Sequence, residues 1–118
     1  MSVPLQITYR EIGSSDAIDA LVRGHVEHLE RLSERILNCH VVLTAGGFGP
    51  KREHPYYEVH IDIVLPGKSL VIDHEPPPKH EHDDLYTAID RAFARAARRL
   101  GDELDRQERS RTTIAESK

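Results

Sequence analysis

The 118-residue chain has little cysteine and few aromatic side chains, and each shortage excludes a class of protein. Its single cysteine, Cys39, rules out a disulfide framework within the chain and fits a reducing compartment. Tryptophan is absent and aromatic residues make up 5%, so the core must be mainly aliphatic. No apolar run approaches the roughly 20 residues of a membrane-spanning helix, and the N-terminus lacks a signal-peptide pattern. We therefore expect a cytoplasmic protein without a membrane partner.

Motifs of common enzyme classes are also missing. The glycine-rich segment 46–49 leads into Pro50 and not into a helix, so it is not a phosphate-binding loop. Cys39 alternates with Val41 and Leu43 in a predicted strand, so we expect it to pack in the core and not to act as a nucleophile. We predict no enzymatic activity, no small-molecule substrate and no cofactor.

Hydrophobic periodicity predicts an α+β fold with the element order β-α-β-β-β-α. Apolar residues three and four positions apart predict helices from Asp16 to about Leu37 and from Leu85 to about Arg106. We expect one four-stranded antiparallel or mixed sheet with both helices packed on one face. The domain should span residues 1–106, and the polar segment 107–118 should be a disordered tail. Alternating apolar and polar residues predict the strands Leu5–Tyr9, Cys39–Thr44, Tyr57–Leu65 and Ser69–His74.

Short polar residues precede both predicted helices and indicate where the helices begin. Ser14 or Ser15 can cap the first helix, because a side-chain oxygen accepts a free N–H of the first turn. Asp83 is the expected cap of the second helix, and Asp84 is favourable near its N-terminal dipole.

A row of arginines on the second helix is the strongest chemical signal. Residues 85–101 contain four arginines against one acid, Asp90, in a chain whose formal net charge is −4. Spaced guanidinium groups suit the phosphates of a nucleic-acid backbone. The alternative is a solvated helix face that nearby acids partly neutralise. At about 100° per residue, one third of the helix circumference carries Arg91, Arg95, Arg98, Arg106 and Arg109.

Histidine is unusually frequent, with eight in the chain, and three lie close together near a proline run. His74, His80 and His82 are weak candidates for metal ligands, because a spacing of two residues occurs in some metal sites. A metal site needs three or four convergent ligands, so a polar, pH-sensitive loop is the favoured interpretation. His40 and His60 are predicted on the outward side of their strands.

The element order, the helix 15–32 and above all the segment Asp83–Asp90 (DDLYTAID) resemble the ribosome hibernation-promoting factor family. That family includes ribosome-associated translation inhibitors and the sigma-54 modulation proteins, and the similarity runs from about Leu5 to Arg106. The resemblance implies a fold like a double-stranded-RNA-binding domain. It also implies binding to small-subunit rRNA near the decoding site, which blocks translation and preserves idle ribosomes in stationary phase or stress.

Site residues follow from the resemblance position by position. Arg95 and Arg98 stand where family members carry lysine or arginine, whereas Asp102 replaces a frequently basic residue. The segment 75–82 is an insertion relative to the best-known short members, and the chain ends before the extra C-terminal domain of long members, so we expect a short form. Arg91 and Arg99 extend the same surface, and we expect Lys51, Arg52 and Lys68 to assist in RNA binding. The predicted RNA-binding residues are therefore Arg91, Arg95, Arg98, Arg99, Lys51, Arg52 and Lys68.

Two other hypotheses remain open at the level of sequence. The acidic net charge and the histidine cluster allow a metal- or pH-responsive regulatory module that acts on a protein partner through His74–Asp84. A dimer formed through an exposed sheet face or edge is the third hypothesis, for which the sequence supplies little evidence either way.

Overall fold

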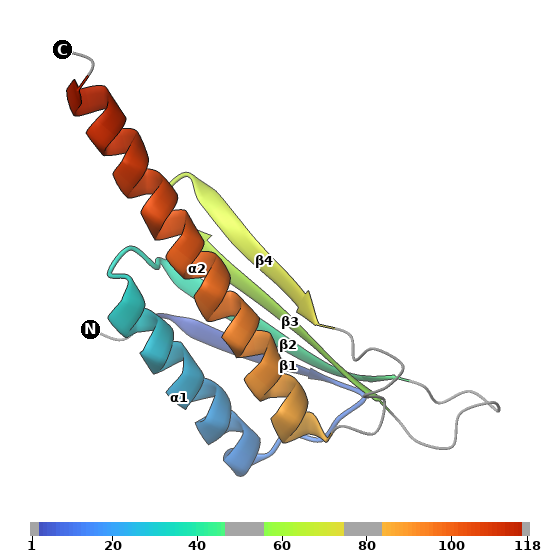
Figure 1. The fold of residues 1–118 in the computed structure, drawn as a ribbon. Helices are drawn as coiled ribbons and strands as arrows, with labels where there is room; N and C mark the ends of the chain where they lie inside the picture. The colour runs from blue at the N-terminus through green and yellow to red at the C-terminus, as the bar shows by residue number, and fades with distance from the viewer. Residues whose placement is uncertain (1–2, 47–55, 75–83, 117–118) are drawn as a thin grey trace.

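The computed structural model describes residues 3–46, 56–74 and 84–116, and it confirms the predicted α+β architecture (Figure 1). The described residues form one four-stranded sheet of the order β1-β2-β3-β4, with β1 parallel to β2 and the remaining pairs antiparallel. Both helices cover one face of this sheet. The elements are β1 (Leu5–Arg10), α1 (Asp16–Leu32), β2 (Asn38–Gly46), β3 (Tyr56–Leu65), β4 (Lys68–His74) and α2 (Leu85–Glu116).

The core lies between the sheet and the helices, where alternate strand residues point. The register aligns Val41 of β2 with Ile61 of β3 and Ile72 of β4, and all three are buried. Cys39 belongs to this same layer, which confirms that it packs in the core. Burial raises the pKa of the Cys39 thiol to about 12, and the negative charge of Asp62 adds to this shift. The thiol therefore stays protonated and unreactive.

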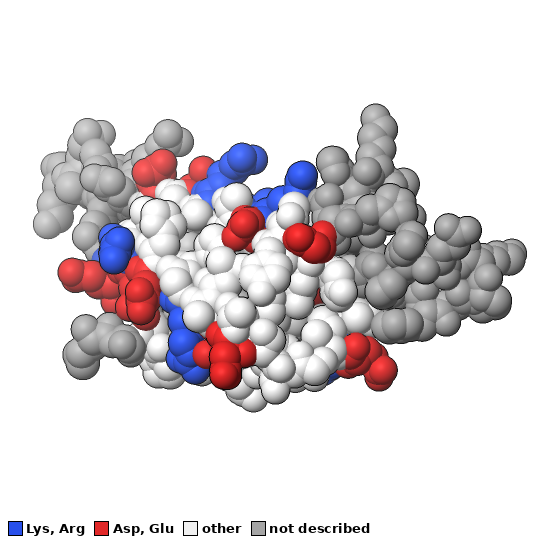
Figure 2. Space-filling model, turned by 90° about the horizontal axis from the view of Figure 1, so that it is seen from below, with Lys and Arg blue, Asp and Glu red and all other residues white. Residues whose placement is uncertain are grey.

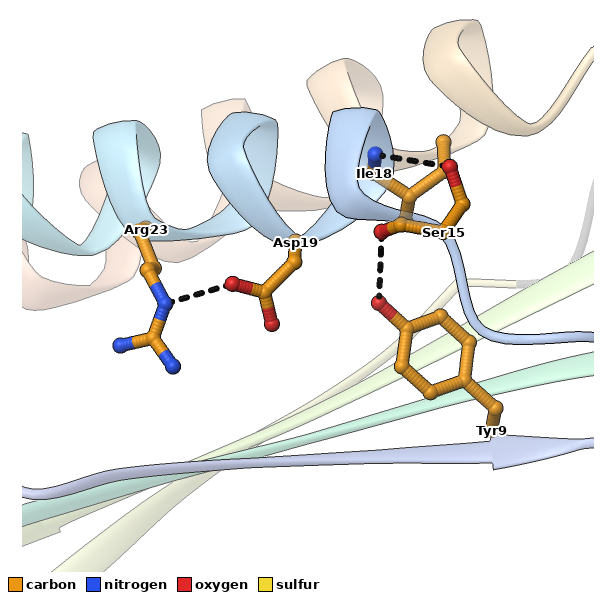
Figure 3. A network of polar contacts seen from close by, with 5 residues as sticks. All are labelled: Tyr9, Ser15, Ile18, Asp19 and Arg23. Atoms are coloured by element: carbon orange, nitrogen blue, oxygen red, sulfur yellow. Dashed lines mark hydrogen bonds and ion pairs between the residues drawn. The ribbon is translucent and has the colours of Figure 1, made fainter.

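Helix α1 begins where the sequence predicts and ends earlier. Ser15 is the N-cap, because its side chain accepts a hydrogen bond from the Ile18 N–H at 3.4 Å (Figure 3). The predicted end near Leu37 is wrong: Ser33 adopts an extended backbone and its N–H donates to the Leu29 carbonyl at 3.1 Å. Ile36 is buried nevertheless. The apolar spacing therefore continues past Ser33 because the connection turns Ile36 back into the core.

Helix α2 begins at Leu85 and is capped by Asp84, whose Oδ1 accepts from the Thr87 N–H at 2.8 Å. The predicted cap, Asp83, lies outside the described residues. The helix continues past Arg106 to Glu116, through most of the segment expected to be a disordered tail. No glycine or proline interrupts this segment, so a helix that begins on the core can extend beyond it. A domain boundary at residue 106 stays a prediction.

No helix in the described ranges of the chain combines the length and the apolar character that a membrane span requires.

Candidate functional site

Four exposed arginines follow one another along α2, and we call them the arginine stripe: Arg91, Arg95, Arg98 and Arg99. Their spacing of three and four residues keeps them on neighbouring helix positions. The opposite side of α2 carries Ile89, Phe93 and Leu100, which are buried against the sheet and α1. Burial of that apolar side fixes the direction in which the stripe points.

Two members of the stripe contact the edge strand β4. Arg95 Nη1 donates to the Asp73 carbonyl at 3.1 Å, and Arg99 Nη1 donates to the Val71 carbonyl at 2.5 Å. Because β4 is the last strand of the sheet among the described residues, these arginines occupy carbonyls that no further described strand takes. A guanidinium has five N–H donors. Each of the two arginines therefore keeps its charge and most of its donors for another partner.

The remaining members of the stripe are Arg91 and Arg98, and both are exposed. Arg91 lies one turn before Arg95, in line with the two arginines that hold β4. Within the described part of the chain, no hydrogen bond or ion pair involves Arg98, and it is the least constrained member of the stripe. Arg106, which the sequence placed in the same row, lies 3.9 Å from the Glu103 carboxylate.

Lys68, a predicted RNA-binding residue, has a partner inside the molecule. Its Nζ lies 2.8 Å from Glu103 Oε2, and the Glu103 side chain is only 8% exposed against 38% for Lys68. A buried carboxylate needs such a partner, because an unpaired charge away from water is costly. Lys68 therefore supplies less free positive charge than the stripe does.

Sequence reasoning missed Glu103, although a signal was present. Glu103 follows Ala96 and Leu100 at helical spacing, so it occupies a position of the buried side of α2. A single acid in an apolar stripe predicts a buried carboxylate with a cationic partner. The same region forms a pocket of about 240 Å³ lined by Lys68, Ser69, Leu70, Arg99, Asp102, Glu103 and Arg106.

The outer side of α1 has a different electrostatic character from the arginine stripe. Arg23 Nε is paired with Asp19 at 2.6 Å, next to the contact of the Tyr9 hydroxyl with the Ser15 carbonyl (Figure 3). Glu30 Oε1 accepts a hydrogen bond from the Val3 N–H at 2.7 Å. Figure 2 shows one face of the molecule, on which acidic and basic side chains are scattered over a broad uncharged area. A groove of about 960 Å³ beside α1 is lined by Val3, Pro4, Glu27, Glu30, Arg31, Ser33, Glu34, Ile36 and Leu37.

The uncovered face of the sheet carries His40 and His60, as the sequence predicts. His40 Nε2 and Thr8 Oγ1 are hydrogen-bonded at 2.9 Å, and His60 Nδ1 lies 2.5 Å from Asp73 Oδ1. Asp62 is the register partner of His40, and its Oδ1 is buried without a hydrogen-bond partner. These are local polar pairs on a sheet surface.

Comparison with known proteins decides the family. The family model described as sigma 54 modulation protein / S30EA ribosomal protein matches residues 5–108. This chain belongs to that family. Family membership confirms the resemblance carried by the segment 83–90. No curated protein matches the chain.

Two solved structures share the fold of this family member. The N-terminal domain of Protein Y from Thermus thermophilus is 27% identical with a TM-score of 0.66, over 86% of this chain and 98% of that one. A ribosomal subunit interface protein from Coxiella burnetii is 19% identical with a TM-score of 0.68, over 87% of this chain and 99% of that one. At 19% identity the second likeness supports the fold alone.

The residues that carry the family resemblance anchor the start of α2. Asp84 caps the helix, and Ala88 and Ile89 are buried in the core. Asp90 Oδ1 lies 2.7 Å from Nε2 of His25, whose ring stacks on Phe93 with the centroids 4.8 Å apart. This segment therefore fixes α2 against α1, and the stripe begins directly after it.

Several predicted site residues lie outside the described residues, namely Lys51, Arg52, His80 and His82. His74 is described, and it is buried at the end of β4. Among residues 3–46, 56–74 and 84–116, no three His, Cys, Asp or Glu side chains are grouped so as to hold a metal ion. The proposed regulatory segment 74–84 is described only at its two ends.

Proposed function

We propose that this family member is a ribosome hibernation factor that binds small-subunit rRNA near the decoding site. The observation that carries the proposal is the arginine stripe, a row of exposed guanidinium groups in a chain whose net charge is −4. The family description, which includes S30EA ribosomal protein, makes the ribosome the partner to test first. Occupancy of the channel for mRNA and tRNA would block translation in the cytoplasm without any enzymatic step.

Phosphate recognition is the chemistry that the stripe supports. Folded RNA is recognised largely through shape and through phosphate and ribose contacts, and each guanidinium can donate two hydrogen bonds to phosphate oxygens. Arg95 and Arg99 are held in place by the carbonyls of Asp73 and Val71. A guanidinium that is already ordered loses less conformational entropy when it binds.

The charge distribution sets the orientation of the bound protein. Along the groove beside α1, three glutamates, Glu27, Glu30 and Glu34, stand against one arginine, Arg31, so this side repels RNA phosphates. The arginine stripe lies on the side of α2 that contacts β4. We therefore expect α2 and β4 to face the rRNA and the acidic groove to face away from it.

Co-sedimentation with purified small ribosomal subunits tests the proposal. Binding should weaken steeply between roughly 50 and 300 mM salt, because each neutralised phosphate releases counterions. Arg95→Glu combined with Arg98→Glu should abolish binding at intermediate salt. The slope of log affinity against log salt should fall by about one unit for each phosphate that is no longer neutralised.

A matched variant controls for net charge. Arg23→Glu combined with Arg31→Glu makes the same charge change on α1 and should leave binding within about threefold of the unaltered chain, since exposed charges far from the bound surface matter little. Equal losses for the two double variants would contradict the assignment of the surface. No sedimentation of the unaltered chain at the lowest salt would contradict the proposed function itself.

A further inference from the structure

The two edge strands of the sheet, β1 and β4, differ in whether side chains donate hydrogen bonds to their outward backbone groups. At the β4 edge, Arg95 and Arg99 donate hydrogen bonds to the backbone of the strand. At the β1 edge, residues 3–46, 56–74 and 84–116 place no strand beyond Leu5–Arg10 and no side chain hydrogen-bonded to its backbone. An edge strand that nothing protects is a template for pairing with another strand.

The ladder between β1 and β2 identifies which backbone groups of β1 point outward. The Cys39 N–H donates to the Pro4 carbonyl at 3.0 Å, so the carbonyl of Pro4 faces β2. In a parallel pair, alternate residues turn their N–H and C=O groups to opposite sides. The residues whose backbone groups point away from β2 are therefore Leu5, Ile7 and Tyr9.

The side chains of the same three residues mark an incompletely covered margin of the core. Leu5, Ile7 and Tyr9 point to the core side of the sheet and are only half-buried, whereas the inward residues of the middle strands are buried. Ile12 and Leu21, which pack against the same core, are also only partly buried. A partner beside β1 would remove further apolar surface from water.

We propose that β1 pairs with β1 of a second copy of this chain, antiparallel and around a two-fold axis at Ile7. In that register Ile7 faces Ile7 and Leu5 faces Tyr9, so the outward backbone groups of both strands meet in hydrogen-bonded pairs. No charged residue lies from Leu5 to Tyr9, so the pairing places no like charges opposite each other. The product is a continuous eight-stranded sheet with all helices on one face.

The protected β4 edge explains why the assembly stops at two copies. A two-fold contact uses the same surface on both partners and is closed. Its outer edges are then both β4, where Arg95 and Arg99 already occupy the carbonyls of Asp73 and Val71. A single strand from each copy makes a small interface, so the dimer should be weak and concentration-dependent.

Sedimentation velocity together with amide hydrogen exchange tests the inference. Between about 10 µM and 1 mM, a range suited to small interfaces, the sedimenting species should shift toward twice the mass of one chain. Over the same range the amides of Leu5, Ile7 and Tyr9 should change from fast to slow exchange. Monomer at the highest concentration would overturn the proposal, and so would a dimer in which these three amides still exchange fast, since it would use another surface.

A variant that places positive charges opposite each other across the two-fold axis tests the β1 contact, and a variant of β4 with the same added charge is its control. Gln6 and Thr8 face each other in the proposed register, so Gln6→Lys combined with Thr8→Lys should raise the dissociation constant by about tenfold or more through like-charge repulsion. Ser69→Lys combined with Val71→Lys adds the same charge to exposed positions of β4 and should leave the dimer unchanged. Equal increases of the dissociation constant in both double variants would overturn the assignment of the dimer contact to β1. If a variant fails to fold, hydrogen exchange of the unaltered chain tests that assignment without it.

Discussion

Individual arginines of α2 serve the fold and remain available for binding at the same time. Arg95 and Arg99 each donate one hydrogen bond to the backbone of β4, at Asp73 and Val71. An arginine can do this and still bind elsewhere because its planar group carries several donors in fixed directions, whereas a lysine is a single point charge. Lys68 illustrates the difference, since its ammonium group is committed to Glu103.

The Lys68–Glu103 pair yields a prediction at the residue scale. Lys68→Met removes the cation that lies 2.8 Å from the buried Glu103 carboxylate, while Arg106 lies farther away at 3.9 Å. We therefore expect a loss of about 1–3 kcal/mol in the free energy of unfolding, measured by urea denaturation. Lys68→Met combined with Glu103→Met should recover most of the loss, because an apolar pair needs no compensating charge.

The exposed Arg98→Met on the same helix is the control for the loss of a surface charge, and it should change stability by less than about 0.5 kcal/mol. If Lys68→Met changes the free energy of unfolding as little as this control does, the ion pair contributes nothing to the stability of the fold and Lys68 is free for other partners.

At the scale of the element, the sequence predicted helices and strands better than their ends. The alternation in β3 and the apolar spacing of α1 depend on burial, which the pattern of residues reveals directly. Helix α1 ends because the backbone of Ser33 is extended and not helical. Ile36, beyond that end, is buried because the following turn directs it into the core, and its position in the sequence happens to match the helical spacing. No local pattern distinguishes such a turn from one more turn of helix.

The cap of α2 yields a prediction about pH. Hydrogen bonds from the backbone and the side chain of Thr87 lower the pKa of Asp84 below its ordinary value of 3.8. The ionised cap therefore stabilises the fold above that value, and this stabilisation disappears as the pH falls through the lower pKa of the folded state. Asp84→Asn keeps a capping side chain and removes the titration.

Thermal unfolding between about pH 2.5 and 7 measures the effect, since the slope of stability with pH reports the difference in bound protons. The stability of the unaltered chain should fall relative to Asp84→Asn below about pH 4. Asp84→Ala removes the carboxylate and the capping side chain together, so it should be less stable than Asp84→Asn across the whole pH range. A pH-independent difference between the chain and Asp84→Asn would contradict the capping account.

At the scale of the whole molecule, the arginine stripe concentrates exposed positive charge on one side of α2, which the net charge of −4 conceals. The sequence predicted that α2 carries a basic row, because helical periodicity places residues around a known axis. It did not predict that Arg95 and Arg99 close the β4 edge, because that contact joins residues 22 and 28 positions apart. Contacts between elements depend on packing, and local patterns do not encode them.

The same reasoning explains why the two ends of the sheet have different proposed partners. The β4 edge is occupied by α2, so its arginines face outward toward rRNA in our proposal. The β1 edge is unprotected in the described part of the chain and is proposed to meet a second copy. Because the two surfaces lie at opposite edges, dimer formation and ribosome binding need not exclude each other.

Chemical footprinting of small-subunit rRNA with the protein bound tests the central claim most directly. The account predicts protection of nucleotides around the decoding site, which Arg95→Glu combined with Arg98→Glu removes and Arg23→Glu combined with Arg31→Glu retains. Protection confined to another region of the rRNA, or protection that survives the loss of the arginine stripe, would contradict it.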